Sequence, residues 1–162
     1  MKPFFILCVD DEREVLDSVA EDLKMFEGKF DIEVAESVQE SREVILEAMT
    51  RGQNLALIFC DHVMPNETGV DFLIELDNDP KTAASKKILL TGQAGLNDTI
   101  EAINNAHLDF FLKKPWTKEE IEDIAKNQLT DFILESSDQP IQYTDILNSE
   151  RIFSEIHKKG SL

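Results

Sequence analysis

Short apolar runs recur along most of the chain and are separated by longer stretches of mixed polarity. Each run is four to six residues long, the usual length of a β-strand. The pattern predicts five strands, of which the second alternates apolar and polar residues with period 2. The five runs are Phe4–Val9, Phe30–Val34, Leu55–Cys60, Lys87–Leu90 and Leu108–Leu112.

The stretches between these runs carry apolar residues at helical spacing. In the first of them, Val15, Val19, Leu23 and Phe26 recur on one face. The predicted helices are Asp11–Phe26, Val38–Thr50, Gly69–Asp77, a helix through Ile103 that begins at Asn97 or Asp98, and a helix from Thr117 to about Leu134.

Two of these helices carry a capping signature. Ser37 and Thr117 are good N-cap residues, and each precedes a glutamate by three positions, Glu40 and Glu120 respectively. In a capping box each of the two side chains accepts the backbone N–H of the other residue. We therefore expect helices to begin directly after Ser37 and Thr117.

The alternation of strands and helices predicts an α/β fold. Parallel strands need crossover connections of helix length, and right-handed crossovers leave only doubly wound arrangements. We expect a five-stranded parallel sheet with helices on both faces.

The segment from 137 to 162 departs from this alternation. Ser136–Pro140 is predicted to be a linker or turn, and later apolar residues predict an amphipathic helix that begins at Asn148 or Ser149. We assign residues 1–136 to one domain and the rest to a linker and a C-terminal helical extension. This extension is expected to pack on the domain or on a second copy, as a homodimer. The start of an output module is the other interpretation.

The charge and composition of the chain limit which kind of partner it can bind and where in the cell it is expected. The chain of 162 residues is 42% hydrophobic and has a formal net charge of −17. Such a surface repels nucleic-acid phosphates and anionic membranes, so we expect a protein partner instead.

No run approaches the roughly 20 apolar residues of a membrane span, and the N-terminus is unlike a signal peptide. Cys8 and Cys60 fall in predicted buried strands, typical of core cysteines in a reducing compartment. We expect a cytoplasmic protein.

Polar residues of complementary charge follow four of the predicted strands. Asp10–Asp11 follows the first, Asp61 the third, Thr91 the fourth and Lys113–Lys114 the fifth. Open α/β sheets bind ligands at the carboxyl ends of their strands. Carboxylates suit Mg²⁺, a carboxylate can attack phosphorus, and an ammonium and a hydroxyl can bind phosphoryl oxygens. Each residue alone also fits a helix cap, a turn or a solvated charge. Together they predict a site for a divalent cation and a phosphoryl group.

The motifs around these residues resemble the receiver domain of two-component response regulators. The matching segments are Val9-Asp10-Asp11-Glu12, Asp61-His62-Val63-Met64-Pro65 with Gly69, Leu90-Thr91-Gly92, and Phe111-Leu112-Lys113-Lys114-Pro115-Trp116. The resemblance covers about residues 4–134. It implies a flavodoxin-like sheet of strand order 2-1-3-4-5.

The resemblance also implies roles for individual residues. Asp61 would accept a phosphoryl group from a sensor histidine kinase or a phosphotransfer protein, and Lys114, which would precede a cis Pro115, would pair with that group. Thr91 and Phe111 would form the switch that carries the signal to a downstream protein. Because Phe111 has no hydroxyl, its part in the switch would rest on packing. The residues implied to hold Mg²⁺ are Asp10, Asp11, Asp61 and, through its backbone carbonyl, Val63.

Other interpretations differ from this one in testable ways. A phosphatase of the haloacid-dehalogenase kind normally has a second Asp two residues after the nucleophile, where this chain has Val63. An FMN binder needs a Ser/Thr/Gly-rich loop where Asp10–Glu12 would repel the phosphate. A phosphate-independent pseudo-receiver is disfavoured because all the charged members of the site are present.

We expect a signalling domain without a DNA-binding output region and without enzymatic activity beyond its own phosphorylation and dephosphorylation. It would be a stand-alone regulator or the receiver of a larger protein.

Overall fold

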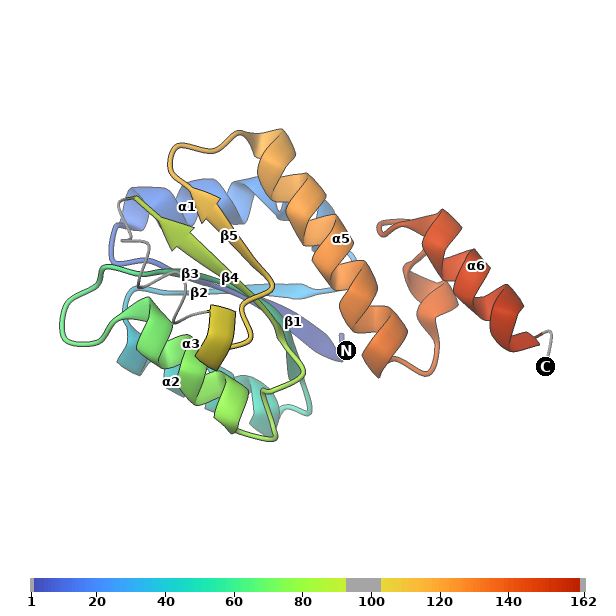
Figure 1. Ribbon diagram of the computed structural model, residues 1–162, viewed down its shortest axis with the longest axis horizontal. Coiled ribbons are helices and arrows are strands. Elements are labelled where there is room, and N and C mark those ends of the chain that lie inside the picture. Colours follow the sequence, from blue (N-terminus) through green and yellow to red (C-terminus); the bar gives the residue numbers. More distant parts are fainter. Residues whose placement is uncertain (1, 93–102, 161–162) are drawn as a thin grey trace.

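The computed structural model of the protein describes residues 2–92 and 103–160. At its centre lies a five-stranded parallel sheet in the order β2-β1-β3-β4-β5, with helices on both faces (Figure 1). The predicted doubly wound α/β fold and its strand order are confirmed. The strands are β1 Phe4–Val9, β2 Asp31–Ala35, β3 Asn54–Asp61, β4 Lys86–Thr91 and β5 Phe110–Lys113.

The helices form one layer on each face of the sheet. α1 and α5 cover one face, and α2 and α3 cover the other (Figure 1). Residues 103–105 are also helical, whereas the predicted start at Asn97 or Asp98 lies outside the described residues. No helix within residues 2–92 and 103–160 combines the length and apolar character needed to cross a membrane. The helices, with η for 3₁₀ turns, are α1 Arg13–Asp22, η1 Lys24–Phe26, α2 Val38–Thr50, α3 Gly69–Asn78, α5 Lys118–Ser136, η2 Pro140–Tyr143 and α6 Ser149–Gly160.

Successive residues of the central strand β3 face two separate cores, as side chains of a strand must. Leu57 and Phe59 pack with residues of α1 and α5, while Ile58 and Cys60 pack with residues of α2 and α3. All four side chains are fully buried. The strand that ends in Asp61 is thus held firmly from both sides.

The first helix is shorter than predicted. It spans Arg13–Asp22 rather than Asp11–Phe26. At its C-terminal end the N–H of Leu23 bonds to carbonyls both three and four residues back, and the chain tightens into η1. At its N-terminal end Glu12 is the N-cap with an extended backbone, so Asp11 stays outside the helix, in the turn after β1.

One of the two predicted capping boxes is complete. Thr117 accepts the N–H of Glu120, whose carboxylate accepts the N–H of Thr117. At the other helix, Ser37 accepts the N–H of Glu40 at 3.0 Å, but the Glu40 carboxylate bonds to the N–H of Glu36 instead. Both helices nevertheless begin where they were predicted to begin.

The fifth strand starts two residues later than the predicted Leu108–Leu112. His107 has a positive φ of 50°, so the chain turns there. The Asp109 carboxylate accepts the backbone N–H of Lys87 at 2.8 Å. The backbone N–H of Asp109 also donates to the carbonyl of Lys87 at 2.9 Å, so Asp109 is bonded to β4 just before β5 begins.

The C-terminal segment packs onto the sheet domain. Tyr143, Leu147 and Ile152 are buried in the core that α1 and α5 cover, and the Tyr143 ring lies 5.4 Å from that of Phe30. The Asn148 side chain accepts the N–H three residues on at 3.1 Å and caps α6, as predicted. The helix lies beyond α5, away from the carboxyl ends of the strands (Figure 1).

Candidate functional site

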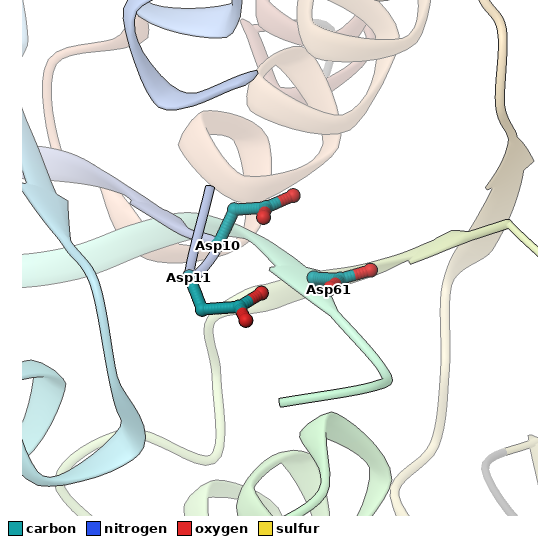
Figure 2. A group of neighbouring side chains, drawn as sticks. All are labelled: Asp10, Asp11 and Asp61. Carbon is teal, nitrogen blue, oxygen red and sulfur yellow. The ribbon is translucent and has the colours of Figure 1, made fainter. Parts of the chain in front are cut away.

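Three carboxylates meet where β1 and β3 end. β1 pairs with β3 through Val9 and Cys60, so Asp10 and Asp61 leave neighbouring strands side by side. Oxygen atoms of Asp10, Asp11 and Asp61 lie within 4.8 Å of one another (Figure 2). Asp10 and Asp61 are buried, and Asp11 is exposed. A set of oxygen donors this close together, open on one side, fits a hard cation such as Mg²⁺.

Lys114 supplies the positive charge of the site. Its Nζ lies 3.2 Å from Oδ2 of Asp10 and 3.3 Å from Oδ1 of Asp61. The other oxygen of Asp10 accepts the backbone N–H of Glu12 at 2.9 Å. Asp10 is thus oriented from two sides, while the ammonium reaches over the end of β3.

The backbone around Lys114 fixes the path of this side chain. Its N–H donates to the carbonyl of Thr91 at 2.7 Å, which joins the ends of β4 and β5. The peptide bond to Pro115 is cis, as the family resemblance implied. Lys113 belongs to β5 and is exposed, so of the two neighbouring lysines Lys114 is the one turned toward the carboxylates.

Electrostatic effects at Asp61 and Lys114 oppose each other. Burial, followed by the negative charge of Asp10, raises the pKa of Asp61, and Lys114 offsets part of that rise. Partial burial alone would lower the pKa of Lys114, but the carboxylates of Asp61 and Asp10 raise it overall. The single positive charge of Lys114 does not balance the three carboxylates of the cluster, and a dication would supply the missing positive charge.

The two residues of the expected switch lie on neighbouring strands. Thr91 is buried at the end of β4, and Leu89 of the same strand pairs with Phe111 of β5. Phe111 is 48% exposed on this edge strand, beside the ring of Phe110 at 6.4 Å between centroids. Phe111 is therefore not part of the buried core.

A close backbone contact shapes the loop between β3 and α3. The N–H of Gly69 donates to the carbonyl of His62 at 2.9 Å. A Cβ atom at this position would lie 2.0 Å from the carbonyl oxygen of Asp61, so only glycine fits. The sequence motif contained Gly69, but its spacing alone did not reveal this contact. Val63, in the same loop, has an exposed side chain.

An apolar groove of about 320 Å³ opens beside Lys114, between α1 and the turn after β5. Sequence reasoning did not identify it, although an aromatic residue after the Lys-Lys-Pro turn was a signal that could have done so. The groove offers a contact surface next to the mouth of the site. It is lined by Glu14, Val15, Ser18, Lys114, Pro115 and Trp116.

Comparison with known proteins agrees with this geometry. The family model of the response regulator receiver domain matches residues 6–126. The chain belongs to the response regulator receiver family. Receivers are signalling domains of two-component systems that bind Mg²⁺ through an acidic pocket, and here the acidic cluster lies at the ends of β1 and β3. The haloacid-dehalogenase and FMN-binding interpretations are thereby excluded as family assignments.

Individual relatives match the receiver over most of its length. Response regulator Rre1 of Synechocystis sp. is 30% identical over 128 residues, which are 79% of this chain and 52% of that protein. The hydrogenase transcriptional regulatory protein HoxA of Cupriavidus necator is 29% identical over 122 residues, 75% of this chain and 23% of HoxA. The chain thus spans about half or less of these relatives. The CheY-like receiver domain protein of Methanospirillum hungatei is 26% identical, with a TM-score of 0.70 over 84% of this chain and 100% of that one.

Proposed function

We propose that this receiver accepts a phosphoryl group on Asp61 from a sensor histidine kinase or a phosphotransfer protein and signals to a downstream protein. The observation that carries the proposal is the ammonium of Lys114, 3.3 Å from the Asp61 carboxylate, beside a cluster of three carboxylates. This arrangement has a nucleophile, a place for a dication and a fixed positive charge within reach of one phosphoryl group.

The proposed reaction transfers a phosphoryl group from a histidine nitrogen of the donor to a carboxylate oxygen of Asp61. A carboxylate oxygen of Asp61 forms the new P–O bond while the P–N bond of the donor's phosphohistidine breaks, and the imidazole nitrogen leaves with the electron pair and takes a proton. Lys114 then pairs with a phosphoryl oxygen, and the hydroxyl of Thr91 donates to another. Mg²⁺, when bound, supplies further positive charge to the phosphoryl oxygens. The residues proposed to hold it are Asp10, Asp11, Asp61 and the carbonyl of Val63.

The proposed output is a change of packing between β4 and β5. As the Thr91 hydroxyl turns toward the phosphoryl group, the half-exposed ring of Phe111 moves into the space that it leaves. Because the ring lacks a hydroxyl, apolar burial alone favours the inward position. An NMR signal of the Phe111 ring that is unaltered by beryllofluoride, a mimic of the phosphoryl group, would contradict this switch.

A homodimer through the C-terminal extension stays a separate prediction. Ile141 and Phe153 are 55% and 51% exposed on this extension and would form its contact surface. Light scattering that gives a monomer mass both with and without beryllofluoride would rule it out.

Intact mass spectrometry after incubation with acetyl phosphate and Mg²⁺ tests the acceptor. Wild type is expected to gain one phosphoryl group that is lost at alkaline pH, and Asp61→Asn to gain none, because an amide is not a nucleophile at this site. Equal phosphorylation of the variant would refute the assignment of Asp61. An absence of label on wild type, with no change of Trp116 fluorescence on adding Mg²⁺ and beryllofluoride, would favour a phosphate-independent receiver instead.

A further inference from the structure

The loop of residues 62–68 borders the carboxylate cluster. It directly follows Asp61 and contains Val63, whose carbonyl is proposed to hold the cation. Its two ends are joined by the bond from the N–H of Gly69 to the carbonyl of His62. Its other side is bonded to a residue from a different helix, Arg42 of α2.

The guanidinium of Arg42 makes five hydrogen bonds, as many as it has N–H groups. It donates to both carboxylate oxygens of Glu67 in the loop at 2.9 and 2.6 Å, and to both of Glu75 in α3 at 2.9 and 2.7 Å. The fifth bond, of 3.2 Å, reaches Gln39. The planar head also lies 5.9 Å from the ring centroid of Phe72. A planar guanidinium can bridge two carboxylates in this way, whereas a lysine ammonium cannot.

These bonds tie the loop to α2 and α3 without touching the carboxylate cluster. All five go to Gln39, Glu67 and Glu75, so, apart from the effect of its charge, Arg42 can influence Asp61 only through the segments that it bonds, of which the loop directly follows Asp61. The Arg42 side chain is 32% exposed, and exposed ion pairs contribute little to stability. The bridge is therefore better suited to fixing the loop than to holding the fold.

We propose that Arg42 is a positioning residue, which holds the loop of residues 62–68 in place beside the carboxylate cluster and thereby sets the affinity for Mg²⁺. This inference rests on the proposed function, because the loop matters for the cation only if its carbonyl is a ligand. Residues that orient a metal ligand without binding the metal themselves commonly affect the affinity for the metal.

Charge and positioning predict opposite effects when Arg42 is replaced. Loss of the positive charge of Arg42 makes the surroundings of the site more negative, which by itself strengthens the attraction for a dication. Loss of the bridge frees the loop and weakens binding, because one ligand is no longer held in place. The sign of the change in Mg²⁺ affinity therefore separates the two effects.

Isothermal titration calorimetry with Mg²⁺ on wild type, Arg42→Gln, Arg42→Lys and Arg51→Gln tests the proposal. Arg51 is a matched control: it ends the same helix and pairs with Glu33 and Glu47 at 3.6 and 3.3 Å, away from the loop. We expect Kd to rise about tenfold in Arg42→Gln, the lower end of the effect of residues that orient metal ligands. Arg42→Lys keeps the charge and should still lose affinity, whereas Arg51→Gln should bind as wild type or slightly more tightly.

Amide hydrogen exchange provides a readout that does not depend on the metal. The N–H groups of Gly69 and Val70 both bond to His62 and so report on closure of the loop. Both should exchange faster in Arg42→Gln, with the amides of β1 unchanged. Unchanged exchange, or unchanged or tighter Mg²⁺ binding, in Arg42→Gln would overturn the positioning role. Wild type that binds no Mg²⁺ would instead refute the proposed function, and this inference with it.

Discussion

Two lysines, one near the start of β4 and one just after the end of β5, lie in opposite environments. Lys87 is near the start of β4 and is 1% exposed. Its Nζ donates to the carbonyls of Ser85 and Ala83 at 2.9 and 3.2 Å and lies 3.7 Å from the carboxylate of Asp77. Backbone groups that cannot move away thus hold this ammonium at the amino end of the strand.

Lys114 lies at the other edge of the sheet, beyond the end of β5. Its side chain is 24% exposed and faces the carboxylates of Asp10 and Asp61. A cation could replace Lys114 as the partner of these acids, and a phosphoryl group could draw the ammonium toward itself.

The comparison teaches that the groups around a lysine ammonium decide whether it stabilises the fold or takes part in chemistry. Burial lowers the pKa of Lys87 and the nearby Asp77 opposes this effect only in part, whereas carboxylates raise the pKa of Lys114. Lys87 joins α3 to β4 and has a structural role. Lys114 is held by the carboxylates that are proposed to react and to bind metal, so we expect it to be available for chemistry.

The largest expected effect comes from Lys114→Met. Removal of this charge should slow phosphorylation by acetyl phosphate about 10²-fold or more, as for other groups that stabilise developing negative charge. The far-ultraviolet circular dichroism spectrum should stay that of wild type. A phosphorylation rate within twofold of wild type, measured by intact mass against time, would contradict the role of Lys114.

Lys87→Met should change stability and leave the chemistry intact. It removes the ammonium from the carbonyls of Ser85 and Ala83 and from Asp77, which we expect to cost about 3 kcal/mol of unfolding free energy. Lys86→Met is the matched control, because its ion pair with Glu135 is partly exposed and should matter by less than about 1 kcal/mol. Urea unfolding measures both changes. Equal stability of the two variants would show that Lys87 is no structural anchor.

A smaller effect should distinguish the two lysines in alkaline solution. The ordinary pKa of lysine is 10.5. Because the folded pKa of Lys87 is lower, the unfolded chain binds more protons between the two values, so the contribution of Lys87 to stability rises with pH there. The folded pKa of Lys114 is higher, so its contribution falls as pH rises above 10.5.

Urea unfolding between about pH 8 and pH 11 measures this difference, with the stability of each Met variant subtracted from that of wild type. The difference for Lys87 should rise with pH below 10.5, and the difference for Lys114 should fall with pH above 10.5. Slopes of the same sign would mean that the two ammonium groups are not in the contrasting environments described above.

The sequence alone determined the fold and the residues of the candidate site. Apolar runs of strand length mark the buried strands, and parallel strands bring their carboxyl ends to one edge. Asp10, Asp61 and Lys114 therefore meet although they are far apart in the chain. Helix starts at Ser37 and Thr117 were also predictable, because capping depends on residues three positions apart.

Tertiary structure decided which of several similar residues has which environment. Neighbouring lysines, such as Lys86 and Lys87, look alike in the sequence, but the pleat of β4 turns Lys86 toward Glu135 of α5 and Lys87 toward Asp77 of α3, on opposite faces of the sheet. The bridge from Arg42 to Glu67 joins residues 25 positions apart, and the contact of Gly69 with the Asp61 backbone depends on how α3 meets the sheet. These features depend on packing between elements, whereas periodicity and capping are local properties of the chain.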